Sequence, residues 1–218
     1  MARRKIKISK PRKTTYAIIV DGETEFWYFQ MLKRNEPNLQ VNIEPKIPQK
    51  KNISEQYEKI IELSEDFTKV FWIIDLDVVI AESKMTKKGE TNQIQKLKNY
   101  LNTIEKKCDN VITIINNPCL EFWFILHYNQ TTKYYPQCKE AETELKKHLK
   151  DYQKTQKYFT KQNDDIYLKL KSKLSTAVIR AQNTKREGFE EIEQAICEMN
   201  LFFEAKQIKE ARKQRLKI

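Results

Sequence analysis

Carboxylates stand directly after three apolar runs of this sequence. Asp21 and Glu25 follow the first run, Asp75 and Asp77 follow the second, and Glu121 lies just beyond the third. Carboxylate oxygens are the ligands that hard divalent cations such as Mg²⁺ and Mn²⁺ prefer. A pair of such cations about 3.5–4 Å apart activates water and stabilises a leaving oxygen in phosphodiester cleavage. The acids therefore suggest a metal-dependent hydrolytic site.

The elements that would position these acids alternate between strands and helices. Continuous apolar runs with β-branched residues predict buried strands, and apolar residues at helical spacing predict amphipathic helices. Alternation of this kind is typical of a parallel sheet with helices on both faces. The carboxyl ends of its strands share one edge, so we expect the three acidic groups to meet there. The predicted strands cover residues 16–20, 41–47, 70–74 and 111–115, and the helices that follow them cover 24–33, 52–65, 94–108 and 120–128.

The strand pattern stops near residue 129, and only helices are predicted beyond it, at 140–152, 164–182 and 186–205. We therefore expect an α/β fold with a parallel four-stranded sheet flanked by helices and a helical C-terminal part. The expected divisions are a basic N-terminal arm (1–14), an α/β core (15–128), a helical C-terminal extension (129–205) and a basic C-terminal tail (206–218).

Each acid has a structural alternative when it is considered alone. Asp75 and Asp77 could terminate a strand, because Asp is common in turns. If the strand continued through them, both side chains would point to the same side. Glu25 could be an ordinary residue of a first helical turn, and Glu121 could pair with a basic residue. His127, at the end of an apolar helix, is expected to cap or pack rather than to touch substrate. The shared sheet edge is what favours a metal site.

Composition excludes several nucleotide-binding motifs and indicates an anionic partner. The chain has three glycines, which cannot supply a P-loop, a dinucleotide-binding fingerprint or a hydrolase nucleophile elbow. Any ATP hydrolysis would therefore need another chain. The net charge is +11, and basic residues crowd the first and last thirteen positions. This excess favours nucleic acid as a partner, although a lysine-rich proteome would explain the overall charge equally well.

Cellular location and cysteine chemistry are predicted from absences. The first residues lack the apolar segment of a secretory signal, and no apolar run approaches the roughly 20 residues needed to span a bilayer. We therefore expect a cytoplasmic protein without a membrane partner and with reduced thiols. No two of the four cysteines have metal-binding Cys-x-x-Cys spacing, and Cys119 is expected to act as a small buried hydrophobic residue.

Two segments resemble the signatures of RloB-like proteins. Residues 20–29 (VDGETEFWYF) are similar to that family's Glu-Gly-x-Thr-Glu-x-x-Tyr-Phe start. Residues 117–127 (NPCLEFWFILH) are similar to its Asn-Pro-x-Phe-Glu-x-Trp-Leu-Leu-x-His signature. With Asp75-Leu76-Asp77 between them, the resemblance covers roughly residues 15–205.

This resemblance implies a Toprim-like fold and a metal site. Carried over to this sequence, the metal ligands are Asp21, Glu25, Asp75 and Asp77, with Glu121 as a further ligand or base. The family is linked with restriction and abortive-infection loci, often beside an AAA-type or ABC-like ATPase, which fits the missing P-loop. One position departs from the pattern: Asp21 stands where the family has Glu. The shorter side chain would shift the metal, pass its role to a nearby glutamate or weaken the site.

The sequence therefore predicts a Mg²⁺- or Mn²⁺-dependent nuclease of antiphage defence that cleaves DNA or RNA, with tRNA among the candidate substrates. Its expected partners are nucleic acid and an ATPase encoded nearby, and a homodimer is left open. One alternative is a non-catalytic nucleic-acid-binding or regulatory subunit, which Asp21 favours. Another is a metal-dependent nucleotide-processing or ligand-sensing enzyme, which a compact pocket would favour.

Overall fold

The protein is described here by a computed structural model that covers residues 13–20, 22–39, 41–44, 52–87, 89–184 and 193–213. Residues 1–12 of the predicted basic arm, residues 214–218 of the predicted tail and Asp21 lie outside this description. Strand β1 already begins at Lys13, so the predicted arm overlaps the sheet by two residues. Within the described residues, no helix is both long and apolar enough to cross a membrane.

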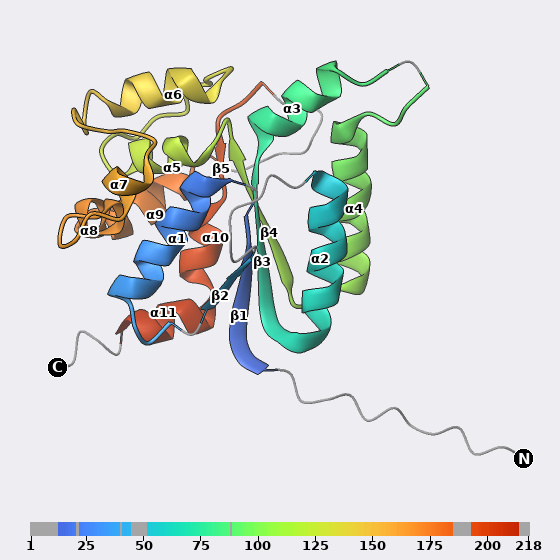
Figure 1. Cartoon of the computed structure of the whole chain (residues 1–218), viewed down its shortest axis with the longest axis horizontal. Coiled ribbons are helices and arrows are strands. Elements are labelled where there is room, and N and C mark those ends of the chain that lie inside the picture. Colours follow the sequence, from blue (N-terminus) through green and yellow to red (C-terminus); the bar gives the residue numbers. More distant parts are fainter. Residues whose placement is uncertain are drawn as a thin grey trace, which may run out of the picture.

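The centre of the molecule is a sheet in the order β2-β1-β3-β4-β5 (Figure 1). The first four strands pair in parallel, and β5 pairs antiparallel with β4. The α/β class is confirmed, but the expected four strands are five. The strands are β1 (Lys13–Ile19), β2 (Val41–Glu44), β3 (Phe67–Asp75), β4 (Val111–Asn117) and β5 (Ile196–Cys197).

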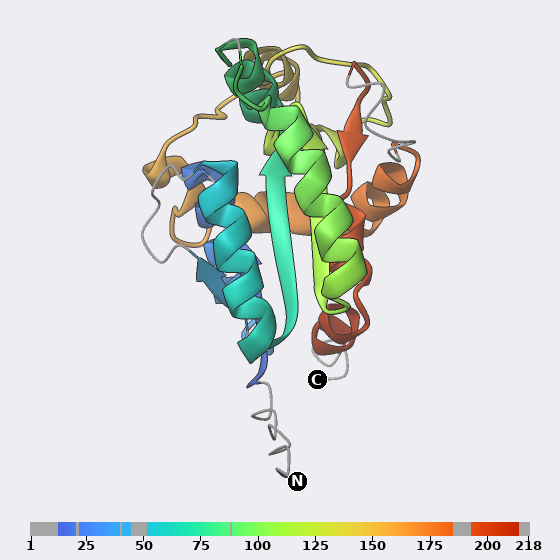
Figure 2. The same cartoon turned by 90° about the vertical axis from the view of Figure 1, so that its right-hand side faces the viewer.

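Helices cover both faces of the sheet, as the alternation predicts. In Figure 2 the helices α2 and α4 lie in front of one face, and Figure 1 shows α1 and α10 on the other side. Two separate apolar clusters result, because successive strand side chains point to opposite faces: Trp72 packs with one cluster and Phe71 with the other. The helices between the strands are α1 (Glu23–Asn35), α2 (Ile53–Asp66), α3 (Leu76–Lys84), α4 (Gln93–Lys107) and α5 (Leu120–Leu126).

Local sequence explains where these helices begin and end. Asn52 accepts hydrogen bonds from the amides of Ser54 and Glu55, while Glu55 accepts one from the Asn52 amide, so a capping box starts α2. Strand β3 is nine residues long, and Asp75 is at once its last residue and the N-cap of α3. The strand therefore does not continue to Asp77, which lies in the first turn of α3. The condition under which both side chains would point to the same side, a strand that runs through Asp75 and Asp77, is therefore not met.

The C-terminal part is mostly helical but differs from the prediction in three places. The helix predicted at 140–152 ends at Leu145, and the one predicted at 164–182 is two helices separated at Lys173, whose ψ of 3° leaves helical geometry. Of the helix predicted at 186–205, residues 186–192 lie outside the described part of the chain, and the rest contains β5, which is fixed by pairing with β4 at a distant point of the chain. The helices here are α6 (Cys138–Leu145), α7 (Gln156–Phe159), α8 (Ile166–Lys171), α9 (Leu174–Gln182), α10 (Met199–Glu204) and α11 (Lys206–Lys213).

The apolar cluster beside α1 joins both halves of the chain. Buried residues of α1 and α5 pack there with residues of α8, α9 and α10. Trp123 donates a hydrogen bond from its indole nitrogen to the hydroxyl of Tyr28 (3.0 Å), which connects α5 with α1 inside this core. Because residues beyond 129 complete this core and supply β5, they help to hold α1 and α5 in place at the sheet edge.

Candidate metal centre

Three helices begin at the carboxyl edge of the sheet, and each brings an acid to it. Glu25 is the third residue of α1, Asp77 lies in the first turn of α3, and Glu121 is the second residue of α5. Asp75 ends β3 between them. The structure thus places four of the five predicted site residues along one edge, and the fifth, Asp21, lies outside the described residues.

Glu25 is buried among other acids. The N-cap of α1 is Gly22, and a β-carbon there would collide with the carboxylate of Glu25, so glycine is needed for this carboxylate to fold back over the helix start. Burial, and next the charge of Glu121, raise the pKa of Glu25 to about 7; a hydrogen bond with Asp75 and the charge of Lys154 act in the opposite direction. Such a carboxyl group is repelled by its neighbours unless it holds a proton or a cation lies beside it.

The two aspartates accept hydrogen bonds from later elements of the chain. Asp75 Oδ2 accepts from the Leu120 amide (3.3 Å) and Oδ1 from the side-chain amide of Asn116 (3.5 Å). Asp77 Oδ2 accepts from the Cys138 amide (3.3 Å) at the start of α6. Burial, more than any other influence, raises the pKa of Asp77. These bonds tie β3 and α3 to the beginnings of α5 and α6.

Glu121 is fully buried and has three partners. Its Oε1 accepts hydrogen bonds from the Tyr152 hydroxyl (2.6 Å) and from the Lys154 ammonium (2.9 Å). Its Oε2 lies 3.0 Å from Cys138 Sγ. Lys154 is 38% exposed, yet the charges of Glu121, Asp75 and Glu25 outweigh its desolvation and raise its pKa. In the part of the chain that the structure describes, Lys154 is therefore the basic group placed against the acids.

Two buried oxygens at this edge suit a cation. Within the described part of the chain, Oδ1 of Asp77 and Oδ1 of Asn116 have no hydrogen-bond donor. Buried acceptors without donors are costly, and a divalent cation or its water ligands would satisfy them. The candidates to bind such an ion, directly or through its water ligands, are Asp75, Asp77, Glu25 and the Asn116 amide oxygen. The sequence did not mark Asn116 as a candidate cation ligand, because asparagine is common at the ends of strands.

The spread of these acids limits how they could bind metal. Among the described residues, the triple of candidate ligands whose atoms lie within 4.8 Å of one another is Cys119, Glu121 and Cys138, not the carboxylates alone. Magnesium usually keeps several waters and binds through one or two carboxylates, so a tight carboxylate triple is not required. The donor set therefore fits a hydrated hard cation better than a dry cage.

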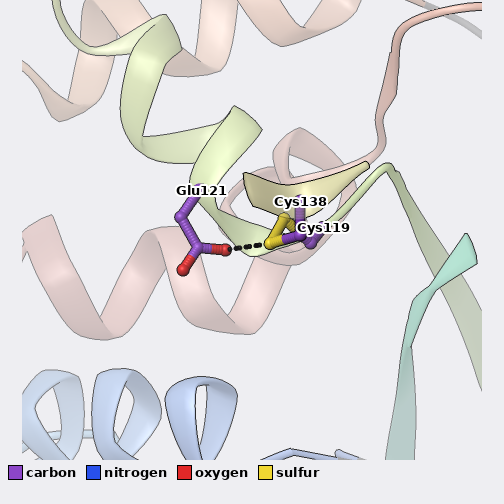
Figure 3. Close-up of side chains that lie close together, drawn as sticks. All are labelled: Cys119, Glu121 and Cys138. Atoms are coloured by element: carbon purple, nitrogen blue, oxygen red, sulfur yellow. Dashed lines mark hydrogen bonds between the residues drawn. A yellow bond between two sulfur atoms is a disulfide. The ribbon is translucent and has the colours of Figure 1, made fainter. Parts of the chain in front are cut away.

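The cysteines differ from expectation. Cys119 is buried but forms a disulfide with Cys138, so the prediction of reduced thiols, with Cys119 as a plain hydrophobic residue, is wrong for this pair. Cys108 and Cys197 are free thiols. The two bonded residues are 19 positions apart, and they meet because Cys119 caps α5 where Cys138 begins α6. Figure 3 shows Glu121 pointing from α5 toward this bond.

His127 does not reach the acids. It is 2% exposed, its Nδ1 lies 2.9 Å from the Trp123 carbonyl oxygen, and its ring packs edge-on against the Trp123 ring. Burial lowers the pKa of His127 to about 3, so the imidazole is neutral at physiological pH. These contacts support the expected packing role.

A cleft of about 710 Å³ opens beside Asp77. It lies between α3 and the start of α6. Its lining is partly apolar, with Ile80 and Tyr134, and partly charged, with Lys84 and Lys139. Glu25, Asp75, Asp77 and Glu121 together form what we call the acidic edge of the sheet. A molecule in this cleft would approach it from the side of Asp77.

The fold and this edge define an α/β protein with carboxylates gathered beyond the strands of a largely parallel sheet. A family model for RloB-like proteins matches residues 16–211 of the 218-residue chain. The chain therefore belongs to the RloB-like family. No curated protein and no solved structure matches it.

The contacts of Glu121 give a stability prediction. We expect Glu121→Gln to lower the free energy of unfolding by about 2 kcal/mol, because Lys154 and Tyr152 lose a buried charged acceptor. This figure is below that of a fully buried pair since water screens the exposed side of Lys154. Glu142→Gln is the matched control: Glu142 pairs with Lys146 at the surface of α6, and its loss should cost less than about 0.5 kcal/mol.

Urea unfolding in the absence of divalent cations measures both changes. In the double variant Glu121→Gln/Lys154→Met, part of the loss should return, since no lysine is left without its partner. A Glu121→Gln protein as stable as the wild type would show that the pair contributes nothing to folding.

Proposed function

We propose that this protein is a Mg²⁺- or Mn²⁺-dependent nuclease that cleaves phosphodiester bonds in DNA or RNA. One observation carries the proposal: Glu25, Asp75, Asp77 and Glu121 gather at one sheet edge with Lys154 set against them. Among the described residues, Lys154 is the ammonium group in contact with these acids, so their ionisation leaves an excess of negative charge, which a divalent cation offsets.

The chain's own residues have separable parts in this scheme. Asp75, Asp77, Glu25 and the Asn116 oxygen would hold the cation, which when bound supplies Lewis-acid activation of water and neutralises charge on the phosphate. Lys154 holds the Glu121 carboxylate in place through their 2.9 Å contact. The cleft beside Asp77 gives a phosphate group access to this edge, with the basic side chains of Lys84 and Lys139 in its lining.

The proposed biological setting rests on the family. RloB-like proteins are linked with restriction and abortive-infection loci, and we propose antiphage defence with an ATPase partner for this chain as well. The sequence offers no P-loop, so ATP hydrolysis would belong to that partner.

Incubation with defined substrates tests the activity. Purified protein, with and without the neighbouring ATPase, is given Mg²⁺ or Mn²⁺ and plasmid, single-stranded DNA, total RNA or tRNA. We expect cleavage of at least one substrate that is lost with EDTA and in Asp75→Asn. Equal product from wild type and Asp75→Asn would trace the activity to a contaminant or to another site.

A second candidate function is favoured by the cleft. Its volume of about 710 Å³ is within the ordinary range for small-molecule sites, about 300–1,000 Å³. The same acids would then act on a phosphate ester of a nucleotide. Release of phosphate from free nucleotides, without cleavage of any polymer, would favour this candidate over the nuclease.

The basic arm gives a prediction about nucleic-acid binding. Residues 1–12 carry six basic side chains and no acid, and β1 begins only at Lys13. Deleting residues 1–12 should leave folding intact and flatten the salt dependence of binding. Each lost phosphate contact lowers the log–log slope by about 0.7–0.9.

A full-length variant with these six residues changed to glutamine separates charge from chain length and should show the same flattened slope. Fluorescence anisotropy with a labelled oligonucleotide across a salt series measures it. An unchanged slope, with weaker co-purification of the ATPase, would assign the arm to the protein partner instead.

A further inference from the structure

The disulfide between Cys119 and Cys138 lies within the acidic edge rather than apart from it. Cys138 donates its amide to Asp77, and Cys119 immediately precedes Leu120, whose amide is donated to Asp75. Figure 3 shows the carboxylate of Glu121 directed at the bond. Forming or reducing this disulfide would therefore affect the surroundings of three predicted site acids, Asp75, Asp77 and Glu121.

The surroundings of Cys138 Sγ suit a thiol better than a disulfide sulfur. Oε2 of Glu121 lies 3.0 Å away, and a disulfide sulfur has no proton to donate to it, whereas a thiol has one. The Lys154 ammonium lies 3.1 Å from the same sulfur and would stabilise a thiolate. Contacts that favour the reduced form make a disulfide easier to reduce.

The first turn of α6 depends on this bond for its position. Around Cys138, the side chains of Pro136, Gln137, Lys139 and Glu140 are exposed and contribute little packing. Without the covalent bond, the start of this turn would be held only by noncovalent contacts of Cys138: the 3.3 Å hydrogen bond to Asp77 and the contacts of its sulfur with Glu121 and Lys154. Further along, buried residues of α6 would hold it. Few buried contacts mean a low free energy of local opening.

We propose that Cys119 and Cys138 form a redox-active pair whose reduction by a dithiol releases the start of α6 from Asp77. Cys138 borders the cleft, whereas Cys119 is 1% exposed, so the reductant meets Cys138 first. This inference concerns the thiols and α6 and does not require nuclease activity. Its consequence, a change in access to Asp77, does rest on the proposed function.

The reaction is a two-step thiol–disulfide exchange. A thiolate of the dithiol attacks Sγ of Cys138, the bond to Cys119 breaks, and the sulfur of Cys119 leaves with the electron pair and takes a proton. The second thiol of the reductant then attacks the mixed disulfide and releases Cys138 beside Lys154. In total, two electrons and two protons pass from the dithiol to the cysteines, and the reductant becomes a disulfide.

Differential alkylation and hydrogen exchange on the full chain test the proposal. Purified oxidised protein is titrated with dithiothreitol under native conditions, and labelled cysteines are identified by mass spectrometry. We expect Cys119 and Cys138 to become labelled while the protein stays folded. The amides at the start of α6 should then exchange about tenfold faster or more, as expected for the loss of a local constraint. Helix α4, on the other face of the sheet, should not change.

Substitutions supply matched controls. Cys197→Ser, which removes a buried free thiol, should keep the full response to dithiothreitol. Cys119→Ser and Cys138→Ser should show fast exchange at α6 with or without the reductant. Lys154→Met should raise the dithiothreitol concentration at the midpoint several-fold, and Lys157→Met, an exposed lysine nearby, should not.

Three results would overturn the inference. The bond could resist dithiothreitol until the protein unfolds, which would make it a structural cross-link. Reduction could leave exchange at α6 unchanged, which would show that packing alone holds the helix. The reduced protein could bind one Zn²⁺ that Cys138→Ser loses, which would make the pair with Glu121 a metal site.

Discussion

Asp75→Asn is expected to abolish divalent-cation-dependent cleavage. The free energy of unfolding of the metal-free variant should stay within about 1 kcal/mol of the wild-type value or exceed it. Asp75 is the last residue of β3 and forms a hydrogen bond with Glu25, so it lies at the centre of the acidic edge. Asparagine has nearly the same shape and can still accept the Leu120 amide, but it brings one negative charge less. The remaining acids therefore repel one another less when no cation is bound, and they also attract a cation less strongly.

The expected loss of activity is on the order of a hundredfold or more, since removing one charged ligand weakens both metal binding and orientation. Calorimetric titration with Mn²⁺ and cleavage assays measure the two effects separately. Asp66→Asn is the matched control, because Asp66 is exposed at the end of α2, where β3 begins. This change should alter neither Mn²⁺ binding nor cleavage. Full cation-dependent activity in Asp75→Asn would mean that the reaction happens elsewhere.

The order and class of most elements were predictable because local signals agree with the fold. The run before Asp75 is apolar and β-branched, and residues of the predicted strand are fully buried on both faces. In α2, the capping residues Asn52 and Glu55 are three positions apart in sequence, and both hydrogen bonds of the capping box form. Patterns of this kind depend on neighbours in the chain, so sequence alone contains them.

The parts that were missed depend on distant segments. Strand β5 has only two residues and exists because Cys197 and Ile196 pair with the end of β4. Lys154 and Tyr152 reach Glu121 from more than 30 positions away, and no spacing rule connects them. The disulfide is similar, since connectivity cannot be deduced from cysteine spacing.

The acidic edge is an intermediate case. Topology predicted that Glu25, Asp75 and Glu121 follow parallel strands and so share an edge, and the structure places them there. The predicted topology did not show that α3 begins directly after Asp75. Because of this turn, Asp77 lies toward α6 rather than along the strand. The residue at which a strand ends decides which acids face one another. Such boundaries are the least certain part of a prediction from sequence.

Glu25→Gln is expected to stabilise the metal-free protein progressively as pH rises. The pKa of Glu25 is about 7 in the folded protein and 4.5 ordinarily, so between these values the folded state holds a proton that the unfolded state has released. Wild-type stability from this group is therefore lost as pH rises from about 4.5 to 7. Glutamine does not titrate. The variant's advantage should grow across this window to on the order of 3 kcal/mol.

Urea unfolding in EDTA at several pH values gives the free energy of unfolding of both proteins. The difference between them isolates Glu25 from His127, whose lowered pKa of about 3 has the opposite effect: it makes the folded protein more stable as pH rises from about 3 to 6.5. His127 is present in both proteins and cancels. Glu23→Gln, which changes an exposed glutamate two positions earlier in α1, is the matched control for the substitution itself.

Addition of Mn²⁺ extends the same comparison. A cation at the acidic edge favours ionised Glu25, so the wild type should gain stability above pH 7 and recover most of its disadvantage, while Glu25→Gln gains less. A difference between the two proteins that stays constant or shrinks as pH rises in EDTA would show that Glu25 is ionised in the folded state. In that case Lys154 and the helix start of α1, rather than a proton, would be what offsets its charge at the sheet edge.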